Sequence, residues 1–201
     1  RISSLWPEFL DDQFYELMSD TRFLPHFHVS IQHFDDGVLR LMNRNYGFST
    51  LDDVLTKLKW LKRDDANYIS IGGDLIVWFP GETEEAFERM LDAVKRYEIT
   101  KLHAFPFSPH QKGETVPAWR LPNQLPIEVK RERMNRLFEV GEQVRKAFVR
   151  RNDGVVWEAL LEEQKEGVWS WWTPNYLPVR IEWTYERWEV VSVPYQTAWS
   201  Q

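Results

Sequence analysis

The sequence predicts an α/β fold followed by a small all-β unit, from two patterns and one property of composition. Up to residue 151, four apolar stretches of strand type alternate with stretches that carry apolar residues at helical spacing. From residue 155 onward, short β-type stretches follow one another between turn signals. The 201 residues are 43% hydrophobic, which is enough for a packed core. Alternating strands and helices imply a parallel sheet, open or closed into a barrel, with a binding site at the carboxyl ends of its strands.

The first half of the α/β region contains two of these alternations. In HFHVSIQ, the apolar residues Phe27, Val29 and Ile31 alternate with polar ones, which is the pattern of a strand with one polar face. The helical stretches repeat apolar residues three and four positions apart. The expected elements are a strand at 1–5, an amphipathic segment at 11–18, a strand at 26–32 and helices at 37–43 and 50–61.

The second half adds two strands and ends in a long charged helix. The helix at 84–97 opens on acidic residues, as the positive end of a helix dipole favours. We therefore interpret Glu82 and Thr83, just before it, as helix-start residues rather than catalytic ones. The expected elements are a strand at 68–79, a helix at 84–97, a strand at 101–108, a loop at 109–126 and a helix at 127–150. The expected parts are 1–126, a basic connecting helix at 127–151 and a small β domain, of the OB-like barrel type, at 152–201.

The composition excludes several kinds of protein. The chain has no cysteine, so within these residues no disulfide, thiolate-held metal or iron–sulfur cluster can form. Its apolar runs are far shorter than the roughly 20 residues that span a bilayer, and no signal segment opens the chain, so we expect no membrane partner and a cytoplasmic location. The net charge of −6 disfavours general nucleic-acid binding, but residues 128–151 hold eight Lys or Arg against four Glu.

Several motifs of this chain occur together in one known family. They are RISS at 1–4, LPHFHVSIQ with VLRLMNRNY within 24–46, GGDLIVWFPGETEEAF at 72–87, and HAFPFSP with GETVPA within 103–118. With them the chain resembles the carboxyl-terminal two-thirds of the radical S-adenosylmethionine methylthiotransferases, and most of all their tRNA threonylcarbamoyladenosine branch. Through EALLEE and TPNYLPV, its last part is similar to the RNA-binding β-barrel of that family, the TRAM domain.

The resemblance implies an incomplete six-stranded radical-SAM βα barrel, of which the last four strands are present, followed by a TRAM domain. The first two strands, the amino-terminal methylthiotransferase domain and the Cys-x-x-x-Cys-x-x-Cys loop would belong to a missing part of the same polypeptide. The whole enzyme would use S-adenosylmethionine and [4Fe-4S] clusters, whose ligands are not in this chain. The chain alone would then be inactive and would show no iron–sulfur absorbance after reconstitution.

By the same resemblance, six residues would line the cofactor pocket, and none of the residues present would be catalytic. They are Ser3, Ser4, Gln32, Asp74, Ile76 and Phe105. Inward polar side chains beside apolar ones suit a cofactor that carries an adenine, although inward polar residues of a barrel can also simply hydrogen-bond one another. The family usually continues its Gln with Ser-Gly or Ala-Gly, whereas His33 and Phe34 follow here, so the local loop should differ.

His26 and His28 could be interpreted as a metal-binding pair, because residues two apart share one face of a strand. The sequence shows no evident third ligand nearby. We therefore expect a structural or pocket-lining role for both histidines, and no metal.

The partner implied by the resemblance is tRNA, and the basic helix and the β unit are the expected contact surfaces. An RNA-binding protein uses cations that face phosphates and aromatic rings that stack on bases. The candidates are Arg131, Arg145, Arg150, Arg151 and Tyr176. The alternative for the helix is an ordinary solvated face, and for Trp169, Trp171 and Trp172 it is the core of a small barrel.

Two functions follow from these observations. In the first, the chain is part of an enzyme that methylthiolates N6-threonylcarbamoyladenosine next to the tRNA anticodon, or of a related isopentenyl-adenosine or ribosomal-protein methylthiotransferase. In the second, it is a cluster-free RNA-binding or scaffold protein. An in-frame Cys-x-x-x-Cys-x-x-Cys upstream of Arg1 in the gene would support the first, and a start codon at the first residues would support the second.

Tryptophan is over-represented in the chain and glycine is scarce. There are eleven Trp and nine Gly, where ordinary usage predicts about 14 Gly. The family has Gly at the position of Trp78, before the Pro80–Gly81 turn, and Gly is also usual at Trp171 and Trp188. Gly suits a corner where the backbone and a cofactor approach closely or where φ is positive, and a Trp would fill that space or strain the turn. We hypothesise that some of these positions are UGA codons translated as Trp, where the natural protein has Gly.

Overall fold

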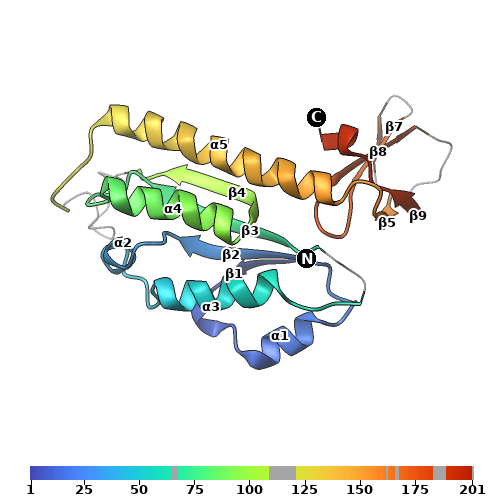
Figure 1. The fold of residues 1–201 in the computed structure, drawn as a ribbon, viewed down its shortest axis with the longest axis horizontal. Coiled ribbons are helices and arrows are strands. Elements are labelled where there is room, and N and C mark those ends of the chain that lie inside the picture. The colour runs from blue at the N-terminus through green and yellow to red at the C-terminus, as the bar shows by residue number, and fades with distance from the viewer. Residues whose placement is uncertain (65–67, 109–120, 162, 166–167, 183–188, 201) are drawn as a thin grey trace.

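The computed structural model describes the chain except for residues 65–67, 109–120, 162, 166–167, 183–188 and 201. It contains a four-stranded parallel sheet with helices on one side and smaller antiparallel sheets at one end (Figure 1). Trp188 and residues 109–120 of the expected loop therefore lie outside the described residues.

The parallel sheet has the strand order β1–β2–β3–β4. Its strands are β1 (Ile2–Leu5), β2 (His26–Gln32), β3 (Ser70–Val77) and β4 (Ile99–Pro106). All neighbouring strands are parallel, so their carboxyl ends share one edge of the sheet. The four predicted strands are confirmed, and the fourth begins two residues earlier than expected because Ile99 already pairs with Ile71.

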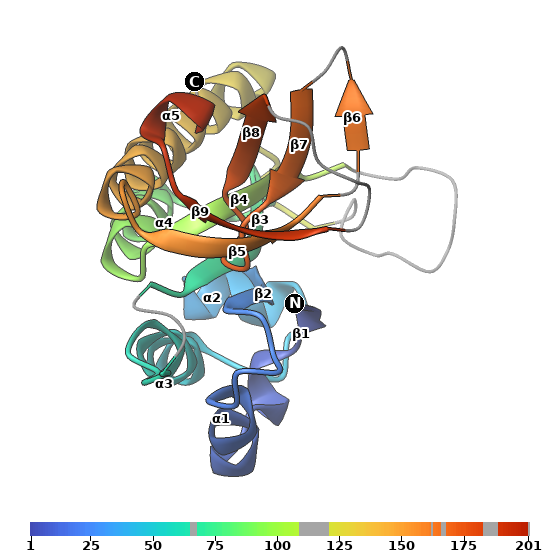
Figure 2. The ribbon, with the colours of Figure 1, turned by 90° about the vertical axis from the view of Figure 1, so that its right-hand side faces the viewer.

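Four helices connect the strands and a fifth follows the last one. They are α1 (Asp12–Met18), α2 (Asp36–Leu41), α3 (Phe48–Lys59), α4 (Glu84–Arg96) and α5 (Ile127–Arg151), with short 3-10 turns at Pro7–Phe9 and Thr197–Ser200. Asp11, Asp35 and Thr83 each accept a hydrogen bond from the backbone N–H three residues later, which is how an N-cap side chain starts a helix. Figure 2 shows α3, α4 and α5 on the same side of the sheet.

The face of the sheet under these helices forms the main apolar core. Phe27, Val29 and Ile31 of β2 point to this face and are fully buried, together with Leu55 of α3 and Phe87 of α4. Because side chains alternate along a strand, the residues between them point to the other side. We call that second side the open face of the sheet.

Beyond α5 the chain forms two small antiparallel sheets. β5 (Val156–Leu160) pairs with β9 (Val190–Pro194), and β6 (Glu163–Lys165), β7 (Val168–Trp172) and β8 (Pro178–Glu182) form the other. Trp169 and Val179 are buried in the apolar core of this β unit, with Trp171 partly buried against them. The short strands predicted after residue 155 are confirmed. Among the described residues, no helix has both the length and the apolar character to span a bilayer.

Candidate functional site

The open face of the sheet carries a pocket of about 320 Å³, next to the loop between β7 and β8. It is lined by Arg1, Ile2, Ser3, Ser4, His26, His28, Asp74, Lys101, His103 and Tyr176. We call it the open-face pocket. Most of its lining side chains are polar because the strand positions that alternate with the buried core residues are polar in this sequence.

Asp74 lies between two histidines in the open-face pocket. Its Oδ1 accepts a hydrogen bond from His28 Nε2 at 3.0 Å and lies 3.5 Å from His103 Nδ1. Strand register explains the grouping, since Asp74 is directly opposite His103 and His28 is opposite Gly72. A Cβ atom on Gly72 would overlap His28 Nδ1 and come within 3.3 Å of His26 Cε1, so the absence of a side chain makes room for both rings.

Stacked rings join the β unit to the same pocket. The ring centroids of His26 and Tyr176 are 4.6 Å apart, and those of Tyr176 and Trp172 are 4.7 Å apart, both nearly parallel. His26 Nδ1 lies 2.9 Å from the Ser70 hydroxyl. Burial lowers the pKa of His26 to about 3, with a smaller contribution from the neighbouring cationic groups. A neutral His26 therefore packs against Tyr176 and fixes the β unit on the open face.

The predicted cofactor residues fall into two groups. Ser3, Ser4 and Asp74 line the open-face pocket. Gln32, Ile76 and Phe105 lie beyond its lining, toward the carboxyl ends of the same strands. Ile76 is directly opposite Phe105 in the strand register, and Phe105 is 53% exposed. The structure thus places a polar pocket and an apolar platform next to each other along β3 and β4.

Left-handed backbone occurs at or next to the carboxyl ends of three neighbouring strands, β1, β2 and β3. φ is +59° at Ser4, +66° at Gln32 and +63° at Trp78, a region that non-glycine residues seldom adopt. Of the two reasons for a Gly at the Trp78 corner, the structure shows the positive φ. Trp171, in contrast, lies within β7, is paired with Val179 and is not among the residues with positive φ.

Trp78 makes contacts that compensate for its backbone conformation. Its indole Nε1 donates to the carbonyl oxygens of Leu125 at 3.0 Å and Pro126 at 2.9 Å. The Lys130 ammonium lies 5.2 Å from the centroid of the ring. The indole therefore joins the end of β3 to the start of α5.

The turn after β3 is held by a buried ion pair. Thr83 is the N-cap of α4, as expected, but Glu82 has a further role. Its side chain accepts from the Phe79 N–H at 3.1 Å and pairs with Arg133 of α5 at 2.8 Å, and both side chains are buried. Burial raises the pKa of Glu82 to about 7, although Arg133 and the backbone N–H groups oppose the shift. From the sequence, Arg133 is one of the eight cations of the basic helix. No neighbouring residue identifies Glu82 as its partner, because the two are 51 positions apart.

His33 and Phe34, which depart from the family pattern, are accommodated in the core. His33 Nδ1 accepts from the Asp35 N–H at 2.9 Å, and the ring of Phe34 stacks on Tyr97 at 5.9 Å. Both residues are fully buried. Burial lowers the pKa of His33 to about 4.

The RNA-binding candidates differ in how much of their charge is already paired. Arg145 pairs with Glu142 at 2.9 Å, and Arg151 pairs with Glu98. The Tyr176 ring already stacks with the rings of His26 and Trp172. Arg131 and Arg150 are exposed and make no side-chain ion pair or hydrogen bond with any described residue. Among the candidates, these two guanidinium groups face solvent with no partner in the part of the chain that the structure describes.

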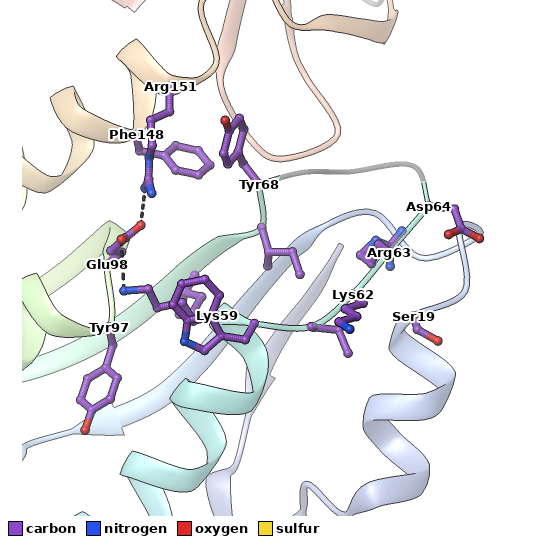
Figure 3. Close-up of a pocket in the computed structure, with 14 residues that line it drawn as sticks. Ser19, Lys59, Lys62, Arg63, Asp64, Tyr68, Tyr97, Glu98, Phe148 and Arg151 are labelled. Carbon is purple, nitrogen blue, oxygen red and sulfur yellow. Dashed lines mark hydrogen bonds and ion pairs between the residues drawn. The ribbon is translucent and has the colours of Figure 1, made fainter.

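A larger hollow of about 740 Å³ lies on the helix side, where α3, α4 and α5 end (Figure 3). We call it the helix-end hollow. Glu98 lies between Lys59 and Arg151 and pairs with both, and Arg63 donates to the carbonyl oxygens of Met18, Asp20 and Phe23. Most cations of this hollow therefore hold the chain together, so its size does not make it the better candidate site.

Comparison with known sequences finds one superfamily and several relatives. The radical SAM superfamily matches residues 1–94. The threonylcarbamoyladenosine tRNA methylthiotransferase MtaB of Bacillus subtilis is 32% identical over 185 residues, 89% of this chain and 40% of the relative. The tRNA-2-methylthio-N(6)-dimethylallyladenosine synthase of Aquifex aeolicus is 34% identical over 168 residues, 83% of this chain and 37% of the relative. The ribosomal protein uS12 methylthiotransferase RimO of Clostridioides difficile is 30% identical over 167 residues, 83% of this chain and 36% of the relative.

The chain therefore spans about 40% of the length of such relatives, less than the two-thirds expected from the resemblance. Among solved structures, coproporphyrinogen III oxidase (HemN) from Escherichia coli, described as a radical SAM enzyme, superposes with a TM-score of 0.56. The match covers 92% of this chain and 52% of that one at 16% identity. At this identity the similarity concerns the fold alone.

Proposed function

This chain belongs to the radical S-adenosylmethionine methylthiotransferases, and from that membership we propose that it is the carboxyl-terminal part of a tRNA-modifying enzyme. The whole enzyme would add a methylthio group to N6-threonylcarbamoyladenosine next to the anticodon. The observation that carries this proposal is the 32% identity to a threonylcarbamoyladenosine tRNA methylthiotransferase over 183 residues, 90% of this chain. That span includes both the parallel sheet and the β unit.

The four parallel strands would be the last four of an incomplete βα barrel. Helices on one face of the sheet and a polar open face on the other support this assignment, because a barrel encloses the face that its helices do not cover. Residues 1–126 would form this part, α5 the connecting helix, and 152–201 a TRAM-like domain. The β unit contributes Tyr176 to the open-face pocket, which supports a shared surface.

The described residues fit S-adenosylmethionine but not the iron–sulfur cluster. Phe105 offers an exposed apolar surface beside Ile76 that suits an adenine, and Ser3, Ser4 and Asp74 offer polar groups nearby. Together with Gln32, these residues would bind and orient the cofactor. When bound to a reduced cluster, S-adenosylmethionine supplies the radical. The chain has no cysteine to ligate such a cluster, so no step is assigned to it here.

The proposal is tested with the whole gene, including the sequence upstream of Arg1. In a bacterial strain that lacks its own threonylcarbamoyladenosine methylthiotransferase, the expressed protein should restore 2-methylthio-N6-threonylcarbamoyladenosine in digested tRNA, measured by mass spectrometry. Methylthio groups found instead on isopentenyl-adenosine or on protein uS12 would assign the protein to another branch of the same family. The similarity to relatives of both kinds makes this a definite alternative. An absence of all three products would favour a cluster-free RNA-binding or scaffold protein.

The RNA-binding part of the proposal is testable on residues 1–201. Fluorescence anisotropy should detect binding to an anticodon stem-loop that weakens as salt rises from 50 to 200 mM. The double variant Arg131→Ala/Arg150→Ala should bind about tenfold more weakly and flatten the salt dependence by about two units of slope, because two phosphate contacts are lost. The control Arg22→Ala/Lys95→Ala removes the same charge from α4 and from the chain after α1, and should bind like the parent. Equal loss in both double variants would contradict a specific role for α5.

A further inference from the structure

We propose that His28, Asp74 and His103 bind one divalent transition-metal ion on the open face of the sheet. One ligand atom from each residue lies within 4.8 Å of the other two. The proposal uses only side chains of this chain, and it shares Asp74 with the cofactor pocket proposed above.

The spacing of the three ligand atoms is close to that of a bound ion. Asp74 Oδ1 is 3.0 Å from His28 Nε2 and 3.5 Å from His103 Nδ1. Two ligands of a tetrahedral zinc ion, each about 2.0–2.1 Å from the metal, are about 3.3 Å apart. The remaining distance, between the two imidazole nitrogens, can shorten by a small turn of the His103 ring, whose side chain is 46% exposed.

Three adjacent strands hold the ligands. His28 is on β2, Asp74 on β3 and His103 on β4, so the positions are fixed by backbone pairing rather than by a loop. Gly72, which is opposite His28, leaves the space that the His28 ring occupies. Ligands on rigid elements lose little conformational freedom on binding, which favours a preformed site.

The charge around Asp74 also favours a cation. Among the described residues, the ion-pair partners of Asp74 are the two histidines, and no Lys or Arg neutralises it. The two cations that line the same pocket are engaged elsewhere: Lys101 lies 3.5 Å from the Tyr176 ring centroid, and Arg1 donates to the Thr173 carbonyl at 2.9 Å. The carboxylate is therefore available to a metal ion.

The donor set indicates the class of metal and the type of site. Two imidazoles and one carboxylate are the ligands of catalytic zinc sites and of non-haem iron(II) sites, in which other positions stay open for water or a small ligand. Here those positions would face the open-face pocket of about 320 Å³. His26 is outside the set, because the ligand atoms that lie within 4.8 Å of one another belong to His28, Asp74 and His103, while the His26 ring stacks on Tyr176. The sequence suggested His26 and His28 as the metal-binding pair; the structure instead groups His28 with Asp74 and His103.

The test is a titration of purified residues 1–201 with cobalt(II) at pH 7.5, followed by its visible absorption bands. We expect saturation at one ion per chain with a dissociation constant in the micromolar range, and displacement of cobalt by zinc(II). His103→Ala and Asp74→Asn should each weaken zinc binding at least tenfold in calorimetry.

Two controls separate this site from other histidines and carboxylates. His26→Gln removes the neighbouring histidine, and Asp92→Asn removes an exposed carboxylate of α4, and both should bind zinc like the parent. His103 is exposed, so His103→Ala should keep the circular dichroism of the parent even if Asp74→Asn does not. A chain without a saturable site, or parent-like zinc affinity in folded His103→Ala, would overturn the proposal. Loss of tRNA binding or of methylthiolation in the whole enzyme would not bear on it.

Discussion

Two hollows on opposite faces of one sheet differ in how their charged groups are used. In the helix-end hollow, Lys59 and Arg151 share Glu98, and Arg63 is bound to three backbone carbonyls. In the open-face pocket, Asp74 faces two histidines and no stronger cation among the described residues. The larger hollow is the one whose charges are already matched. Volume therefore identifies a binding site less well than the presence of groups that the fold leaves without a matching charge.

The largest expected effect is a loss of protein stability when a cation of the helix-end hollow is removed. Arg63→Ala removes three hydrogen bonds from one guanidinium to the carbonyls of residues 18, 20 and 23 and should lower the free energy of unfolding by about 3 kcal/mol. Urea denaturation measures this. Arg22→Ala is the control, because its ion pair with Asp20 is exposed to solvent and should contribute little to stability. Cobalt binding should be the same in both variants. If Arg63→Ala is as stable as the parent, the charged groups of the helix-end hollow do not stabilise the fold.

Acid should destabilise the folded protein through two histidines, one on the open face and one in the core, that are buried in the neutral form. The pKa values of His26 and His33 are lowered to about 3 and about 4, whereas both titrate near 6.5 in the unfolded chain. The unfolded chain therefore binds more protons below pH 6.5. Stability is present above that pH and is lost as the pH falls, on the order of 2 kcal/mol per histidine between pH 6.5 and 5.

Glu82 contributes with the opposite sign, because its raised pKa of about 7 makes the folded chain bind the extra proton between about pH 4.5 and 7. Urea denaturation at pH 7 and pH 5 should therefore show a larger acid loss in Glu82→Gln than in the parent. His26→Gln should show a smaller loss than the parent. A parent chain equally stable at both pH values, with His26→Gln unchanged, would contradict the assignment.

The smallest expected change in the free energy of unfolding is for a substitution at the carboxyl edge of the sheet. Trp78→Gly should alter the free energy of unfolding by no more than about 1 kcal/mol, because release of the left-handed backbone offsets the loss of the indole contacts. Trp171→Gly, in the middle of β7 and packed in the β unit, should cost about 2 kcal/mol or more. A large loss for Trp78→Gly would show that the corner is built for tryptophan. UGG codons at Trp78, Trp171 and Trp188 would exclude the recoding hypothesis.

The strands and helices could be predicted from the sequence because their signals are local. The alternation in HFHVSIQ and the apolar spacing of 50–61 depend only on neighbouring residues. The positive φ at Trp78 could be anticipated from the Pro80–Gly81 turn and the family pattern. Pairings between distant residues could not, because they depend on strand register and helix rotation: His28 meets Asp74, 46 positions away, and Arg151 pairs with Glu98, 53 positions away.

The distance along the chain between Glu82 and Arg133 has a consequence for the order of folding. The pair joins residues 51 positions apart, so during synthesis β3 and its turn leave the ribosome well before α5. Burying a carboxylate without its cation costs several kcal/mol. We therefore expect the turn to stay hydrated in the nascent chain until α5 docks, which makes this contact between distant segments a late step. A ribosome stalled before residue 133 would carry a chain whose β3 strand is complete and whose turn is still exposed to protease.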